Sequence, residues 1–145
     1  MFLFDTHVHT SEISPCGNIT AKETVKLYKK AGYDGICITD HYRKDIFDSW
    51  DGSWEQKLSC YLEGYHNALS YGAEIGLTVL LGAELAFSGL SNEYLLYGLT
   101  EEFLYSYSEL YNYDIKTLHT LLKEYEVFLY HNYIDRKSTR LNSSH

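Results

Sequence analysis

The sequence predicts an α/β fold built on a parallel sheet. Short apolar runs that are typical of buried strands alternate with longer stretches of helical periodicity, as expected for strand–helix–strand units with right-handed crossovers. The chain has 145 residues, of which 45% are hydrophobic and 22% charged, so it is long enough to bury one core. The same length is short for a closed eight-unit α/β barrel, which needs roughly 250 residues.

The first half of the chain contains most of the predicted parallel units. A helix is expected to begin at Thr20, because Thr20 and Glu23 have the spacing of a capping box, and Gly32 can end it in a left-handed conformation. The helical stretch at 54–74 follows a polar, tryptophan-containing loop. The predicted strands are 2–5, 35–39 and 77–81, and the predicted loop is 42–53.

The second half continues the alternation with shorter elements. Asp114 is expected to cap a helix, since a run with helical periodicity follows it. The predicted strands are 93–99 and 126–130, and the predicted helices are 100–108 and 114–124.

The net charge of the chain indicates which binding partners are compatible with it. The formal net charge is -8, and an acidic surface offers no field that would attract nucleic acid, which argues against it as a partner. Bound cations can reverse the sign locally, so a small phosphorylated substrate remains compatible with the composition.

Cysteine content and the absence of a long apolar run indicate the compartment. The three cysteines are an odd number without regular spacing, which favours a reducing environment over a disulfide framework. No apolar stretch approaches the ~20 residues of a membrane span, and the first residues become acidic too soon for a signal peptide. We therefore expect no membrane association and a cytoplasmic protein.

The last eleven residues differ in character from the rest of the chain. Residues 135–145 are polar and without period, and one reverse translation of them resembles a common sequencing adapter. A polar native tail is the alternative. We expect the native domain to cover 1–134, the tail 135–145 to be foreign, and the gene product to be truncated.

Five candidate metal ligands follow predicted strand ends. The C-terminal edge of a parallel sheet is where ligands and chemistry collect. Two imidazoles separated by one residue lie on the same side of an extended segment and can reach one cation. A carboxylate among histidines is suited to bridging two cations. The candidates are His7, His9, His41, Glu84 and His131.

The ordered motifs resemble those of the polymerase and histidinol phosphatase (PHP) domain family. They are Asp-Thr-His-Val-His-Thr at 5–10, Ile-Thr-Asp-His at 38–41, Gly-Ala-Glu at 82–84 and the later His131. The resemblance covers nearly all of 1–134. It implies a distorted (β/α)7 barrel, present here in part and without its C-terminal strands. It also implies two or three divalent ions (Zn, Mn or Fe) and hydrolysis of phosphate esters.

The resemblance also implies individual roles. His7 and His9 would hold the first metal, Glu84 would bridge it to a second, and His131 would complete the second site. His41 would belong to a third. A metal-bound water would be the nucleophile, because cations lower its pKa and neutralise charge on the phosphoryl oxygens, so no protein nucleophile is needed.

The chain departs from the family pattern in three places. Asn132 follows His131 where the family has Pro, and Cys16 lies where many members carry another histidine. Cys16 is either a substitute ligand or a turn residue. The closing Asp-x-His of the family is absent from the sequence.

Three further residues lie beside the candidate ligands. Asp5 and Asp40 either orient an imidazole or satisfy backbone donors at a strand end. Arg43 either binds a substrate phosphate or is an ordinary surface residue.

The sequence thus predicts a metal-dependent phosphoesterase, histidinol-phosphatase-like, acting on a small phosphate ester. An amidohydrolase-type metal hydrolase is the alternative enzyme, although Glu84 stands where a bridging lysine would be expected. A metal-binding module or inactive fragment is the non-enzymatic alternative, favoured by the missing Asp-x-His.

Overall fold

The computed structural model describes residues 1–14 and 17–132. The strands are β1 (Phe4–Val8), β2 (Gly35–Ile38), β3 (His41–Tyr42), β4 (Thr78–Leu81), β5 (Ala83–Ala86), β6 (Glu93–Tyr97) and β7 (Phe128–His131). The helices are α1 (Ala21–Lys30), α2 (Lys44–Asp48), α3 (Trp54–Tyr61), α4 (Glu63–Ile75), α5 (Glu101–Ser106) and α6 (Ile115–Glu124), with a 3-10 turn η1 (Leu110–Asn112).

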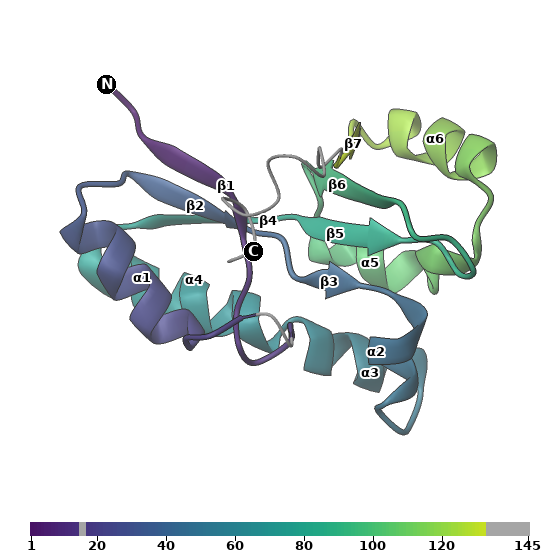
Figure 1. The fold of residues 1–145 in the computed structure, drawn as a ribbon, viewed down its shortest axis with the longest axis horizontal. Helices are drawn as coiled ribbons and strands as arrows, with labels where there is room; N and C mark the ends of the chain where they lie inside the picture. Colours follow the sequence, from purple (N-terminus) through teal and green to yellow (C-terminus); the bar gives the residue numbers. More distant parts are fainter. Residues whose placement is uncertain (15–16, 133–145) are drawn as a thin grey trace.

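The strands form two sheets that lie side by side (Figure 1). The first sheet, ordered β1-β2-β4, is entirely parallel. The second sheet, ordered β3-β5-β6-β7, pairs β3 with β5 in parallel and its other neighbours antiparallel. Two short connections join the sheets: β2 leads into β3 through Thr39 and Asp40, and β4 leads into β5 through Gly82. The sheets therefore meet along a narrow seam.

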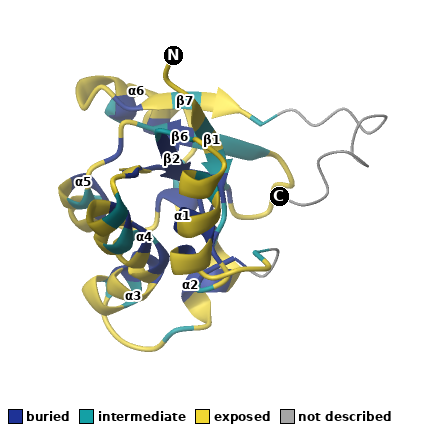
Figure 2. Cartoon of the chain, turned by 90° about the vertical axis from the view of Figure 1, so that its left-hand side faces the viewer, coloured by how far each residue is buried: buried dark blue, intermediate teal, exposed yellow. Residues whose placement is uncertain are grey.

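Each sheet packs against its own layer of helices. Helices α1 and α4 cover one face of the first sheet (Figure 1), with Val25 of α1 and Ile36 of β2 in a cluster of eight buried residues. The second sheet packs against a cluster of twenty buried residues with Tyr42 and Phe47 among its fully buried side chains. Figure 2 shows buried residues on the inner sides of the helices and exposed residues on their outer sides.

The predicted helix starts are confirmed. Thr20 accepts a hydrogen bond from the backbone N–H of Glu23 at the start of α1, and Asp114 accepts one from Thr117 at the start of α6. These side chains satisfy N–H groups that have no partner within the helix. The helical stretch at 54–74 is divided into α3 and α4 at Leu62.

The prediction of a wholly parallel sheet is wrong for β6 and β7. Residues 87–92 connect β5 to β6 without a helix, and so short a connection permits only an antiparallel neighbour. The polar loop predicted at 42–53 is also wrong, because it contains the end of β3 and all of α2. Ile46 and Phe47 of α2 are buried, and this apolar pair holds the segment against the core.

None of the helices within 1–14 and 17–132 is long and apolar enough to cross a membrane.

Candidate metal centre

Four of the five candidate ligands meet at the seam between the two sheets. His7 lies in β1 and His9 directly after it, His41 opens β3, and Glu84 is the second residue of β5. His41 and Glu84 are register partners in the parallel pair of β3 and β5. The first sheet thus contributes the histidine pair, and the second contributes the carboxylate with a third histidine.

A bulge in β1 turns the histidine pair towards Glu84. The register with β2 shifts between Asp5 and Val8. Asp5 accepts a hydrogen bond from Tyr28 of α1, and Val8 is buried in the cluster beside that helix, so both side chains face the helix layer. Residues three apart would face opposite sides of a regular strand, and the bulge removes that alternation. His7 lies within this irregular stretch, and its Nε2 reaches Glu84 of the second sheet.

The carboxylate of Glu84 faces imidazoles with both of its oxygens. Its Oε2 contacts Nε2 of His7 and lies 3.1 Å from Nε2 of His9. Its Oε1 lies 3.4 Å from Nδ1 of His41. The two Nε2 atoms of His7 and His9 are 3.2 Å apart, and Glu84 is only 3% exposed. Three ring nitrogens from two segments thus converge on one buried carboxylate.

The protonation states suit this arrangement. Burial favours the neutral acid, but hydrogen bonds from His7 and His9 lower the pKa of Glu84 well below its ordinary value. Burial and the neighbouring His9 lower the pKa of His41 to about 4, so its ring is neutral near pH 7. An ionised carboxylate and a neutral imidazole are the forms that bind cations.

Asp40 organises the backbone around the ligands. Its carboxylate accepts hydrogen bonds from the backbone N–H of Thr10 (2.7 Å), the hydroxyl of Thr10 (2.8 Å) and the hydroxyl of Ser14 (2.9 Å). The Ser14 hydroxyl in turn accepts the backbone N–H of His41 at 3.1 Å. Burial raises the pKa of Asp40 to about 6 against the opposing effect of these hydrogen bonds. The segment after His9 is thereby tied to the start of β3.

Asp5 and Arg43 lie beside the seam. Asp5 accepts the backbone N–H of His7 at 3.0 Å as well as the Tyr28 hydroxyl, so it contacts the backbone of His7. Arg43 is paired with Asp45 at 3.0 Å and lines a cavity of about 340 Å³ with residues 86–90. A second cavity, of about 240 Å³, is lined by His7 and His9.

Glu93 was not among the residues predicted from the sequence. Its carboxylate forms a close group with His41 and Glu84, whose potential ligand atoms all lie within 4.8 Å of one another. The hydrogen bond with Glu84, together with burial, raises the pKa of Glu93 to about 8. The only signal in the sequence is an acidic residue at the start of a predicted strand, which is too common to single out.

His131 lies apart from both groups. The register pairs Tyr94 of β6 with Leu85 of β5 on one side and with His131 of β7 on the other. Leu85 belongs to the buried cluster of the second sheet. Side chains directly opposite one another share a face, so His131 is on the face away from Glu84. Its ring centroid lies 5.1 Å from that of Tyr94. Cys16 lies outside the described residues.

Comparison with known sequences identifies the family. Residues 5–143 match the sequence model of the PHP domain. The chain belongs to the PHP domain family. The PHP motifs at 5–10, 38–41 and 82–84 are therefore the segments that meet at the seam. No curated protein matches the chain.

Three solved structures resemble this PHP domain. A two-domain protein of Bacteroides vulgatus with a predicted PHP-like metal-dependent phosphoesterase has 17% identity and a TM-score of 0.64, covering 88% of this chain and 34% of that one. It shows the fold. A protein of Bifidobacterium adolescentis proposed to be a metal-dependent phosphoesterase has 28% identity, a TM-score of 0.45 and coverages of 66% and 27%. An amidohydrolase of Chromobacterium violaceum has 20% identity, a TM-score of 0.43 and coverages of 64% and 26%. The chain spans about a third or less of each.

The side chains at the seam fit a divalent cation. His7, His9 and Glu84 offer two nitrogens and one oxygen within 4.8 Å of one another. Donors of these types bind Zn, Mn or Fe. Two carboxylates and three imidazoles gathered in one mostly buried place also carry negative charge that a cation would neutralise.

Proposed function

We propose that this PHP domain is part of a metal-dependent hydrolase that acts on a small phosphate ester, with histidinol phosphate as the first compound to test. The observation that carries the proposal is the orientation of Glu84. One of its oxygens faces His7 and His9 and the other faces His41. A carboxylate held in this way is suited to bridge two cations.

The chain's own residues would each have a limited task. His7 and His9 would hold one cation and His41 would face the other, with Glu84 shared. When bound, two such cations lower the pKa of water and neutralise charge on a phosphoryl oxygen. Asp5 would orient His7 through its backbone, and Asp40 would keep the segments after β1 and β2 at a fixed separation.

Arg43 and the neighbouring cavity would receive the phosphate. Its guanidinium lies at the edge of the cavity formed with residues 86–90, and it is 32% exposed on its side chain. Guanidinium groups form strong paired hydrogen bonds with phosphate oxygens. The salt bridge to Asp45 is at the surface and contributes little to stability. Arg43 can therefore leave Asp45 for a phosphate at a small cost in free energy.

We also propose that the two sheets are part of the distorted (β/α)7 barrel expected from the family. Support comes from the shared fold with the Bacteroides vulgatus protein and from the parallel pairing of β1, β2, β4 and of β3 with β5.

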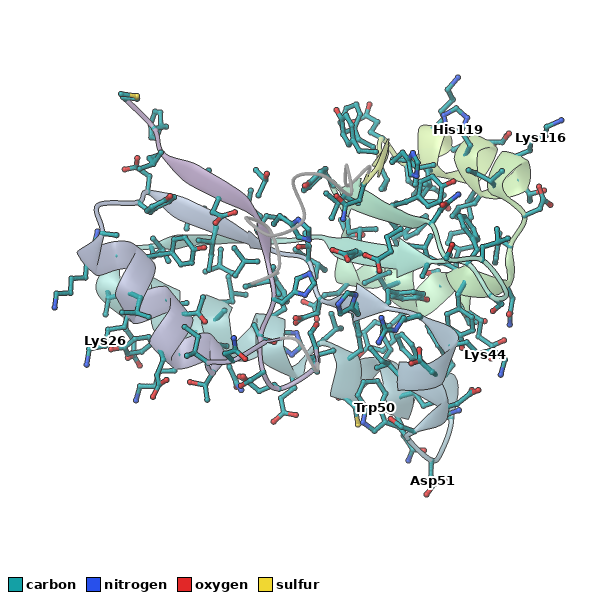
Figure 3. All side chains as sticks on the ribbon, viewed as in Figure 1. Lys26, Lys44, Trp50, Asp51, Lys116 and His119 are labelled. Carbon is teal, nitrogen blue, oxygen red and sulfur yellow. The ribbon has the colours of Figure 1, made fainter. Side chains whose placement is uncertain are left out.

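Turnover of p-nitrophenyl phosphate and of histidinol phosphate with added Mn²⁺ tests the function. We expect His7→Ala to lower both bound metal and kcat/KM by at least about 100-fold, because a ligand matters more than the outer partners whose loss costs ~10–100-fold. His119→Ala is the matched control, since His119 lies exposed on α6 and away from the seam (Figure 3).

Three results would overturn the proposal. Unchanged turnover in His7→Ala would remove the metal centre from the reaction. Hydrolysis of an amide substrate in preference to both phosphate esters would favour an amidohydrolase. Metal binding without any hydrolysis would favour a binding module.

A further inference from the structure

Glu93 gives the seam a second carboxylate, placed there by the β5–β6 hairpin. The register pairs Glu84 with Leu95 and Ala86 with Glu93. Glu93 is two residues from the partner of Glu84, so the two side chains share a face and are diagonal neighbours. Diagonal neighbours with long side chains can touch, and the ligand atoms of Glu93, Glu84 and His41 do lie within 4.8 Å of one another.

The two groups at the seam differ in their chemistry. His7, His9 and Glu84 offer two nitrogens and one oxygen, whereas His41, Glu84 and Glu93 offer one nitrogen and two oxygens. Imidazole-rich sites suit Zn²⁺, and carboxylate-rich sites suit Mn²⁺ and Mg²⁺ better. Because Glu84 belongs to both groups, the two sites adjoin.

We propose that Glu93 is a metal ligand, and that with His41 and Glu84 it forms an oxygen-rich site whose preference for Mn²⁺ over Zn²⁺ exceeds that of the His7–His9 site. The inference rests on the metal centre of the proposed function. It assigns to Glu93 the difference in metal preference between the two sites. A bare carboxylate pair is the competing explanation. In that case Glu93 is simply a protonated acid that donates a hydrogen bond to Glu84.

The variant Glu93→Gln separates these explanations. Glutamine has the shape of a protonated glutamic acid and can donate the same hydrogen bond, but it lacks the negative charge of a ligand. Titration of metal-free protein with Mn²⁺, followed by the electron paramagnetic resonance signal of the free ion, counts the sites and gives their affinities. Glu124→Gln, at the exposed end of α6, is the matched control.

We expect the wild type and Glu124→Gln to bind two equivalents of Mn²⁺. In Glu93→Gln one equivalent should bind at least about 10–100-fold more weakly, the loss that even an outer partner of a ligand causes. If Glu93→Gln retains both equivalents at wild-type affinity, Glu93 is only a hydrogen-bond donor and the inference is overturned.

Zinc competition supplies a second test, which begins with the wild-type protein. In the wild-type protein, Zn²⁺ should release one Mn²⁺ first. Release of the second Mn²⁺ should need a Zn²⁺ concentration at least about 10-fold higher. Glu93→His should remove that difference, because it gives the second site two nitrogens. Equal displacement of both ions in the wild type overturns the inference. Neither readout uses phosphate turnover, so the inference can fail while hydrolysis persists, and it can hold where hydrolysis is absent.

Discussion

The two sheets differ in how they are built and in what they bring to the seam. The first sheet is wholly parallel and covers a cluster of eight buried residues beneath α1 and α4. The second sheet is mixed and covers twenty buried residues, several of them aromatic. From the first come the nitrogens of His7 and His9, and from the second come the carboxylates of Glu84 and Glu93. A cation held by both sets would link two sheets with cores of unequal size.

Hydrogen bonds between backbone and side-chain groups also join the two sheets. Tyr97 of β6 donates a hydrogen bond to the carbonyl of Thr6 in β1 at 2.9 Å. Backbone hydrogen bonds run from Gly82 to Ile38 and from Glu84 to Asp40 along the two connections. Because its cluster holds eight buried residues against twenty in the other, we expect the first sheet to be the less stable half.

Leucine-to-alanine substitutions in the two clusters should give the largest effect, a difference in the loss of free energy of unfolding. Leu58→Ala removes a buried side chain from the twenty-residue cluster of the second sheet. Leu77→Ala removes a buried side chain from the eight-residue cluster of the first sheet. We expect the free energy of unfolding to fall by about 4–5 kcal/mol in Leu58→Ala and by about 2–3 kcal/mol in Leu77→Ala. A cluster of twenty residues that contains stacked aromatic rings should relax into a cavity less readily than an aliphatic cluster of eight.

Urea unfolding followed by far-UV circular dichroism measures both losses. Leu69→Ala is the control, since Leu69 is 39% exposed on α4 and should cost far less. Equal costs for Leu58→Ala and Leu77→Ala would mean that the two clusters act as one core, and the comparison would fail.

Substitution of Asp40 should break the link between the halves at intermediate cost. Asp40→Ala leaves the buried N–H and hydroxyl of Thr10 and the hydroxyl of Ser14 without their acceptor, at about 1–3 kcal/mol for an unsatisfied group. Because the segment after His9 is then no longer tied to His41, Mn²⁺ affinity should also fall by about 10–100-fold.

The more conservative Asp40→Asn separates the two effects. It keeps one acceptor oxygen and nearly the same volume, so it should recover most of the stability while metal affinity stays below that of the wild type. Isothermal titration with Mn²⁺ and urea unfolding report the two quantities. Wild-type metal affinity in Asp40→Ala would show that the ligands are positioned without this network.

The difference between the parallel first sheet and the mixed second sheet also explains what the sequence could predict. The caps at Thr20 and Asp114 and the strands β2 and β4 depend on local patterns, and they are found as expected. Strand β1 runs from Phe4 to Val8, whereas the apolar run predicted a strand at 2–5. His7, His9, His41 and Glu84 belong to motifs at the ends of neighbouring parallel units, where side chains from distant segments gather, and in the structure they lie together.

The second sheet depends on pairings that local patterns do not contain. The antiparallel hairpin of β5 and β6 sets the register that brings Glu93 to Glu84, and neither strand alone indicates it. The same register places His131 on the opposite face, although its sequence position after a strand suggested otherwise. The predicted role of His131 as a ligand remains a prediction, and its face in this sheet gives it no shared group with Glu84 among the described residues.

Native-state labelling should reveal the smallest effect, the separate opening of the first sheet. Cys37 of β2 is buried, and burial raises the pKa of its thiol to about 12, whereas Cys60 of α3 is exposed. At pH 8 iodoacetamide should therefore modify Cys60 and leave Cys37 intact, since the thiolate is the reactive form. The chain's two tryptophans, Trp50 and Trp54, pack against the second cluster and report on that half.

With increasing urea, alkylation of Cys37, located by mass spectrometry, should begin before the tryptophan fluorescence changes. The pKa of Cys37 is raised in the folded state, so the burial of its neutral thiol adds stability below about pH 9, and this stability is lost as the pH rises towards about 12. Alkaline conditions should thus widen the interval between the two transitions. Mn²⁺ should narrow it, because its ligands come from both sheets and binding stabilises only the joined form. Coincident transitions at every pH, with and without Mn²⁺, would mean that the two sheets unfold as a single cooperative unit despite their unequal cores.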